Sequence, residues 1–219
     1  MSQPVDARQY APATQRNREP ILHILQQVLP SRGTVLEISS GTGEHAVFLA
    51  PRLRSLTWIT SDPDPTARAS ITAWQTECKT DNLYGPLVLD VREVQWPVEQ
   101  DPLPELLRRL NLQQQPIAAI VNINMIHIAP WSACLGLMAG AERILPAGGV
   151  LYLYGPFKQN AEHTAPSNAA FDASLQARNP QWGVRDLAEV SAIAQQHQLD
   201  LLKTVTMPAN NLSVVFQRR

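Results

Sequence analysis

The chain has 219 residues, of which 44% are hydrophobic and 17% are charged, and its formal net charge is −1. These values suit one globular domain with its own core and differ from those of a disordered chain. A nearly neutral charge without a Lys/Arg-rich run excludes a broad nucleic-acid footprint, and the longest apolar runs are far shorter than the ~20 residues that cross a bilayer.

Short apolar runs alternate with helical patterns along the chain, and prolines and glycines stand between them. After a polar leader over 1–19, we expect a helix that begins at Pro20, because proline suits the first helical position. The pattern then predicts strands over 34–39, 55–62, 86–91, 117–124 and 148–155, with helices over 43–53, 66–79, 103–110 and 131–145 between them.

The end of the chain departs from this alternation. An insert over 158–185 precedes a helix over 186–198 and strands over 199–207 and 212–219. Only four residues separate these last two strands, which is too few for a crossover, so they must pair antiparallel. We therefore predict a Rossmann-like α/β fold in one domain over 1–219: a seven-stranded, mostly parallel sheet with an antiparallel terminal strand and helices on both faces.

The segment VLEISSGTGEHA carries the clearest cofactor signal. Glu37 closes the first strand, and Gly41 and Gly43 follow in a turn where open α/β sheets bind ligands close to the backbone. The segment resembles the first motif of S-adenosylmethionine-dependent methyltransferases, with Ser39 standing where that motif has its first glycine. Two alternatives are the nicotinamide-dinucleotide pattern G-x-G-x-x-A, which Gly41, Gly43 and Ala46 satisfy, and a turn needed only for chain closure.

Two aspartates extend this site to the neighbouring strands. Asp62 ends the second strand, where its carboxylate can accept both ribose hydroxyls of an adenosine. Asp90, beside Val91, ends the third predicted strand and is expected to face an adenine amino group. Each aspartate also suits a helix cap or a turn. Three acids at successive strand ends, together with the reversed terminal strand, favour S-adenosylmethionine over a dinucleotide.

The fourth strand and the leader supply further candidates. Asn122 and Asn124 project to one face of the strand; Asn122 is expected at the cofactor and Asn124 at the acceptor. His127 is a candidate general base, or caps the following loop, and Tyr154 is a pocket wall or a core residue. The segment 1–30 is expected to cover the cofactor as a lid, with Arg16 paired to its carboxylate.

The insert over 158–185 is expected to carry the acceptor site, as long segments at this edge of a sheet often do. Trp182 beside Arg178 offers a stacking and cationic surface to an acceptor. Alternatively, Asp172 pairs with Arg178 and Trp182 covers the sheet, while the asparagines of the 208–211 turn only satisfy a hairpin. The candidate acceptor residues are Asn168, Asp172, Arg178, Asn179, Trp182, Asn210 and Asn211.

Four segments resemble the methyltransferase-like protein 26 family: QRNREPIL, NINMIHIAPW, FDASLQARNPQWGVRD and MPANNLSVVF. They are spread over nearly the whole chain, and RNPQWGVRD is the most specific of them. Membership implies the class I methyltransferase fold and a predicted methyltransferase activity, without naming a substrate.

We therefore expect an S-adenosylmethionine-dependent methyltransferase that acts on a small-molecule acceptor by in-line transfer, because the cofactor brings an activated methyl and the protein mainly positions the acceptor. The alternatives are a non-catalytic S-adenosylmethionine-binding interaction protein and a nicotinamide-dependent oxidoreductase. The histidines form no ligand spacing with Cys78 and Cys134, so no metal is expected. Two isolated cysteines and the absence of a secretion signal favour the cytoplasm, without a nucleic-acid or membrane partner.

Overall fold

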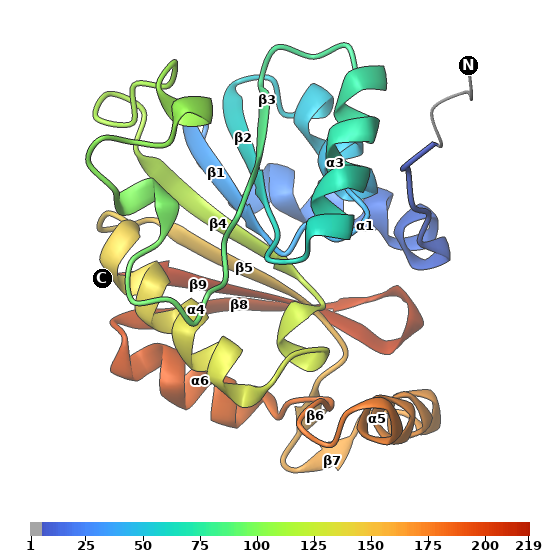
Figure 1. Cartoon of the computed structure of the whole chain (residues 1–219). Helices are drawn as coiled ribbons and strands as arrows, with labels where there is room; N and C mark the ends of the chain where they lie inside the picture. Colours follow the sequence, from blue (N-terminus) through green and yellow to red (C-terminus); the bar gives the residue numbers. More distant parts are fainter. Residues whose placement is uncertain (1–5) are drawn as a thin grey trace.

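A seven-stranded sheet forms the centre of the computed structural model, which describes residues 6–219. Its strand order is β3-β2-β1-β4-β5-β9-β8 (Figure 1). The first five strands pair in parallel, and β9 runs antiparallel between β5 and β8, so the predicted fold class is confirmed. The strands are β1 (Gly33–Ile38), β2 (Leu56–Ser61), β3 (Leu83–Leu87), β4 (Ile117–Ile123), β5 (Val150–Gly155), β8 (Leu199–Met207) and β9 (Asn211–Arg218).

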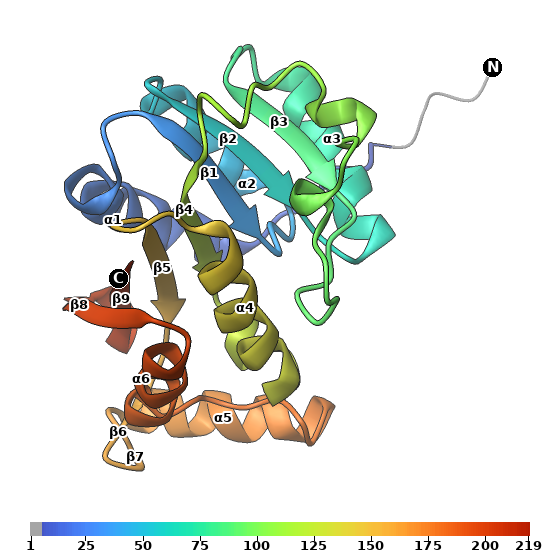
Figure 2. The same cartoon turned by 90° about the vertical axis from the view of Figure 1, so that its left-hand side faces the viewer.

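Helices cover both faces of this sheet (Figures 1 and 2). Neighbouring residues of a strand point to opposite faces, so Val35 packs in the cluster that includes Ile21 of α1, whereas Leu36 packs in the cluster that includes Leu137 of α4. Burial on both faces explains why the strands read as continuous apolar runs. The helices are α1 (Pro12–Val28), α2 (Glu44–Leu49), α3 (Pro65–Glu77), α4 (Trp131–Ile144), α5 (Pro166–Arg178) and α6 (Leu187–Gln196).

The third strand is present, but its predicted bounds, and the helix predicted after it, were wrong. Strand β3 ends at Leu87, so Asp90 lies in the following loop and not at a strand end. Because β3 is an edge strand, it accommodates Pro86, whose missing N–H would disrupt a central strand. In place of the predicted helix over 103–110 there is one 3₁₀ turn, Glu105–Leu107, in which only Leu107 is buried.

The first helix also begins earlier than predicted, at Pro12, and Pro20 lies inside it. An interior proline costs a helix about 3 kcal/mol. Ile21 and Leu25 are both fully buried against the sheet, and each such side chain contributes about 1.5–3 kcal/mol. Packing of this apolar face therefore offsets the cost of Pro20.

The expected insert contains regular structure of its own. A hairpin of β6 (Lys158–Gln159) and β7 (Glu162–His163) leads into α5, which lies beyond the sheet edge in both views (Figures 1 and 2). The chain then returns to the sheet and enters α6. Over residues 6–219, no helix combines the length and apolarity needed to cross a membrane.

Candidate functional site

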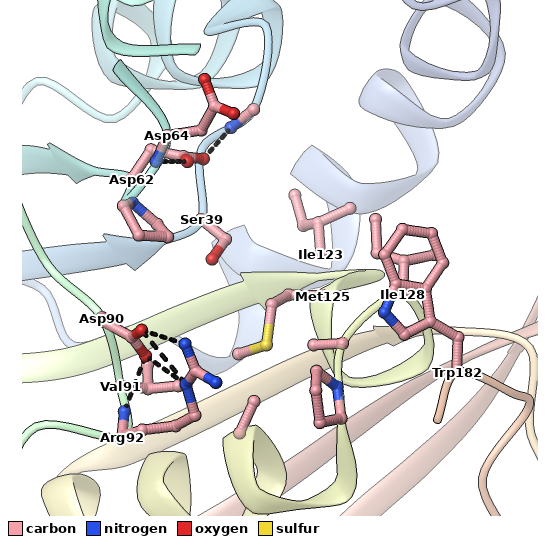
Figure 3. Close-up of a pocket in the computed structure, with 15 residues that line it drawn as sticks. Ser39, Asp62, Asp64, Asp90, Val91, Arg92, Ile123, Met125, Ile128 and Trp182 are labelled. Atoms are coloured by element: carbon pink, nitrogen blue, oxygen red, sulfur yellow. Dashed lines mark hydrogen bonds and ion pairs between the residues drawn. The ribbon is translucent and has the colours of Figure 1, made fainter. Parts of the chain in front are cut away.

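A cavity of about 480 Å³ lies at the carboxyl ends of β1, β2 and β4. The chain leaves β1 for β2 on one side, and β4 lies on the other, so this edge is the point where ligands bind in open α/β sheets. Figure 3 shows the lining side chains. They are Ser39, Gly41, Asp62, Pro63, Asp64, Asp90, Val91, Arg92, Ile123, Met125, Ile128, Ala129, Pro130, Ala133 and Trp182.

The turn after β1 has left-handed backbone at Ser39 (φ 53°), Gly41 (φ 56°) and Gly43 (φ 89°). A Cβ at Gly41 would meet no atom within 4 Å, whereas one at Gly43 would lie 2.9 Å from the Cα of Ile71. Gly41 therefore leaves room for a ligand, and Gly43 allows α2 and α3 to pack closely. Ser39 has the left-handed conformation that glycine favours, at a cost of about 1–3 kcal/mol.

Glu37 supports this turn from inside the fold and does not line the cavity. Its side chain is 2% exposed, and its Oε2 accepts a hydrogen bond from the Trp58 indole at 2.7 Å. Burial raises the pKa of Glu37 to about 7, although the Trp58 bond opposes the shift. The Ser61 hydroxyl donates to the Glu37 carbonyl at 2.8 Å and ties β1 to β2. Glu37 is therefore a positioning residue in this geometry.

Asp62 is the most enclosed carboxylate of the lining, at 6% exposed. Its Oδ2 accepts the Gly41 N–H at 3.0 Å, and its Oδ1 accepts the Asp64 N–H at 2.9 Å. Burial raises the pKa of Asp62, and these two N–H groups oppose the rise. Each oxygen keeps a lone pair that can accept a ligand hydroxyl. The neighbouring Asp64 caps α3 through the N–H of Thr66.

Asp90 lines the cavity but is already paired with Arg92, a residue that the sequence analysis missed. The Arg92 backbone N–H and Nε both reach Oδ1 at 3.0 Å, and the guanidinium also bonds to Oδ2 (Figure 3). These hydrogen bonds lower the pKa of Asp90. An amino group of a ligand would have to share this carboxylate with Arg92.

The opposite end of the cavity is apolar. Trp182, from the segment between α5 and α6, stands across the cavity from Asp62 and Asp90 (Figure 3). Met125 lies between them in the same view. The remaining walls are Ile123, Ile128, Ala129, Pro130 and Ala133, from the end of β4 and the start of α4.

Arg185 holds the Trp182 segment against the loop that follows β4. Its Nε donates to the carbonyl oxygen of Ile126 at 2.9 Å, and its Nη2 donates to those of Ala129 at 2.7 Å and Gln181 at 2.8 Å. The Gly183 N–H donates a further hydrogen bond to the backbone carbonyl of His127, in the same loop, at 2.9 Å. The sequence gives no signal for this role of Arg185, because its partners are backbone carbonyls, which every residue carries.

The candidate catalytic residues lie away from the cavity lining. His127 is fully buried; its ring packs edge-on against Phe157, and its Nδ1 accepts the Arg185 N–H at 3.3 Å. Burial, helped by the Arg185 charge, lowers the pKa of His127 to about 3. Asn124 has φ 66° and forms a turn in which its N–H donates to the Tyr154 carbonyl at 2.8 Å. The expectation that His127 acts as a base beside the cavity, with Asn124 orienting the acceptor, was therefore wrong, because neither residue lines the cavity.

Three further candidates also face elsewhere. The Asn122 amide donates to the carbonyl of Ile38 at 3.1 Å within the sheet. Tyr154 is 2% exposed; burial raises the pKa of its hydroxyl, while hydrogen bonds from Asn17 and Asn211 oppose the rise. Arg16 is an exposed residue of α1 outside the lining.

Residues 6–19, the described part of the leader, do not line the cavity. The Gln9 N–H donates to the Ser70 hydroxyl at 2.8 Å, and the Trp74 indole donates to the Gln9 carbonyl at 3.0 Å, so the leader packs on α3. The Ala11 N–H donates to Glu44 of α2. Residues 1–5 of the expected lid lie outside the described range.

Of the seven candidate acceptor residues, only Trp182 lines the cavity. Asp172 anchors the insert, because it accepts the Val184 N–H at 2.8 Å and pairs with Lys158 at 2.9 Å, not with Arg178. The Arg178 guanidinium lies 5.8 Å from the centre of the Trp182 ring. The Asn168 amide donates to the Asn210 carbonyl at 2.9 Å and so connects α5 to the β8–β9 turn. Asn179, Asn210 and Asn211 stand outside the lining.

No cluster of three metal-ligating side chains occurs within residues 6–219.

Residues 8–218 match the family described as "Protein of unknown function (DUF938)". The chain belongs to the DUF938 family. This match does not test the resemblance to the methyltransferase-like protein 26 family, which stays a prediction.

The DUF938 chain has the fold of class I methyltransferases. It matches the S-adenosylmethionine-dependent methyltransferase SibL in its apo form (TM-score 0.70, 16% identity) and human N-acetylserotonin methyltransferase in complex with SAM (0.71, 11%). It also matches an O-methyltransferase family 2 protein from Planctomyces limnophilus in complex with apigenin (0.70, 16%). Each match covers 94% of this chain but only 55%, 52% and 60%, respectively, of those chains. At these identities, the likeness shows the fold alone.

Proposed function

We propose that this DUF938 protein is an S-adenosylmethionine-dependent methyltransferase that acts on a small-molecule acceptor by in-line methyl transfer. The observation that carries the proposal is the pairing of Asp62 with Gly41 at the cavity wall: an enclosed carboxylate stands beside a backbone position with open space in front of it. This pairing suits a nucleoside, because the carboxylate can accept its hydroxyl groups and the open space at Gly41 lets the ligand come close to the backbone.

The lining fits the parts of the cofactor in order. Gly41 and Ser39 would lie along its amino-acid portion, Asp62 would accept its ribose hydroxyls, and Asp90 with Val91 would border its adenine. When bound, S-adenosylmethionine supplies an activated methyl group. The protein's own part is to orient the acceptor and to exclude water, which the apolar wall that includes Ile123 suits.

The dinucleotide alternative rests on Gly41, Gly43 and Ala46 alone. The reversed strand β9 and the likeness to solved methyltransferases favour S-adenosylmethionine instead. A non-catalytic protein of the same fold would bind this cofactor without transferring its methyl group.

Calorimetric titration with S-adenosylmethionine, S-adenosylhomocysteine and NAD tests the proposal. We expect binding of the first two ligands and none of NAD. Asp62→Ala should weaken their binding roughly 10- to 100-fold, the value of hydrogen bonds to a charged group. Asp62→Asn keeps one acceptor oxygen and should lose less affinity, and Asp81→Asn, at an exposed position before β3, should lose none. Binding of NAD alone, or of none of the three, would refute the proposal.

A further inference from the structure

The two ends of the cavity differ in chemistry. The carboxylates of Asp62, Asp64 and Asp90 gather at one end, and the other end is formed by Trp182 and aliphatic side chains (Figure 3). Apolar walls favour an apolar ligand, because its burial releases water from both surfaces. The indole of Trp182 adds a flat face on which a ring can stack.

The groups that could take a proton from a molecule at this apolar end are held elsewhere. His127 is enclosed by Phe157 and the Arg185 segment, and Tyr154 is buried on the α1 side of the sheet. Neither residue lines the cavity.

The carboxylates at the far end are also engaged. Asp62 accepts two backbone N–H groups, Asp64 caps α3, and Asp90 is paired with Arg92. Within the described part of the chain, the side chains that line the cavity at the Trp182 end are therefore apolar, and the Arg178 guanidinium, 5.8 Å from the Trp182 ring, lies outside the lining.

Classes of methyl acceptor differ in whether they need a general base to remove their proton at neutral pH. A phenol with a pKa near 10 is almost wholly protonated at neutral pH, and an alkyl amine with a pKa near 10.4 has no free electron pair. A thiol with a pKa near 8.5 is a few per cent thiolate at neutral pH, and the thiolate is a strong nucleophile. A cationic methyl donor in the same cavity would offset the cost of removing this thiolate from water.

We propose that the acceptor is a small apolar thiol whose hydrocarbon part packs on Trp182 and the aliphatic wall at the end of β4. This inference rests on the proposed function. The thiol gives its proton to water, and its sulfur electron pair forms the new bond to the methyl carbon. The electron pair of the breaking carbon–sulfur bond stays on the departing thioether, so charge and atoms balance.

The experiment uses the full chain and begins with S-adenosylhomocysteine titration, which tests the proposed function by itself. Thiophenol and phenol then provide acceptors that share one ring and differ in the reacting atom. With S-adenosylmethionine near neutral pH, we expect kcat/KM for thiophenol to exceed that for phenol by more than roughly 30-fold. An alkyl thiol with a pKa near 8.5 is already ionised about 30 times more than a phenol with a pKa near 10, and thiophenol is more acidic than an alkyl thiol.

The pH dependence separates a self-ionising acceptor from a protein base. The more acidic thiophenol should reach its kcat/KM plateau at lower pH than benzyl mercaptan, because each profile follows the ionisation of its own thiol. A base on the protein would give both thiols the same apparent pKa.

Binding of thiophenol to the protein loaded with S-adenosylhomocysteine tests the Trp182 contact without turnover. Trp182→Leu should weaken this binding roughly tenfold, since an aromatic pair contributes up to about 1.5 kcal/mol. It should leave the affinity for S-adenosylhomocysteine unchanged. Trp74→Leu is the matched control, because Trp74 lies on α3 against Tyr10 and outside the cavity lining.

The outcomes distinguish the two proposals. Failure of S-adenosylhomocysteine to bind overturns the proposed function and the thiol inference with it. If it binds, then faster methylation of phenol, no methylation of either thiol, or one shared pKa overturns the thiol inference alone. An unchanged thiophenol affinity in Trp182→Leu overturns the assigned contact.

Discussion

The backbone N–H of Gly41 donates to the carboxylate of Asp62 at 3.0 Å and joins the turn after β1 to the end of β2. Both residues line the cavity, so the same contact shapes the turn and orients the carboxylate. A side chain added in this turn should therefore affect ligand binding and stability separately, depending on which way it points.

Gly41→Ala and Gly43→Ala form a matched pair that tests this geometry. Both positions have positive φ, but only the Cβ at Gly43 would clash, at 2.9 Å from Ile71. We expect Gly41→Ala to cost about 1–2 kcal/mol of stability, and Gly43→Ala to cost more than about 2 kcal/mol because the clash adds to the strain. Gly41→Ala should also weaken S-adenosylhomocysteine binding. Urea unfolding and calorimetry measure the two effects; equal stability losses would contradict the geometry.

Ser39→Gly should stabilise the protein. The substitution removes the strain of a left-handed serine. This gain is larger than the entropic cost of the more flexible glycine in the unfolded chain, so we expect the free energy of unfolding to increase by about 0.5–1 kcal/mol. Ser40→Gly is the control, because the Ser40 hydroxyl accepts the Ser61 N–H at 3.3 Å and its loss should destabilise. Urea unfolding of the two variants measures the free energy of unfolding. A Ser39→Gly protein that is less stable than the parent would show that the backbone at Ser39 is not strained.

Glu37 should make stability depend on pH. Burial raises its pKa to about 7 in the folded state, from 4.5, so the folded protein binds the proton more tightly than the unfolded chain. Its contribution is therefore fully present below about pH 4.5 and is lost as the pH rises through about 7. Glu37→Gln, which keeps an acceptor for Trp58, should remove this pH-dependent loss of stability, which is on the order of 3 kcal/mol. Parallel pH dependences of unfolding in the two proteins would contradict the burial effect.

Arg185 should be more sensitive to conservative replacement than a surface arginine. Arg185→Lys loses the fork that reaches the carbonyls of Ile126, Ala129 and Gln181, and we expect a loss of about 2 kcal/mol or more. The loosened wall should also weaken thiophenol binding, as measured by calorimetry. Arg54→Lys, at an exposed position outside the cavity lining, is the control and should change stability by less than about 0.5 kcal/mol. Similar losses in both variants would show that the Arg185 bonds do not hold this wall.

Local pattern and spacing were sufficient for the sheet and for part of the site. The four residues predicted between the last two strands are too few for a crossover, so the sequence alone required the antiparallel pairing of β8 and β9. Parallel strands place their carboxyl ends at one edge, so the positions of Gly41 and Asp62 beside the cavity followed from where their strands end.

Long-range packing decided the rest. Sequence position brought His127 near the cavity, but its ring turned inward against Phe157, a contact that no local pattern encodes. Arg185 bonds to the Ala129 carbonyl across 56 residues of chain, and this bond helps hold Trp182 in the wall, while Asp172 and Asn168 anchor the insert. Periodicity reports which elements form and where they end, whereas the direction of a side chain depends on the surfaces that distant segments bring against it.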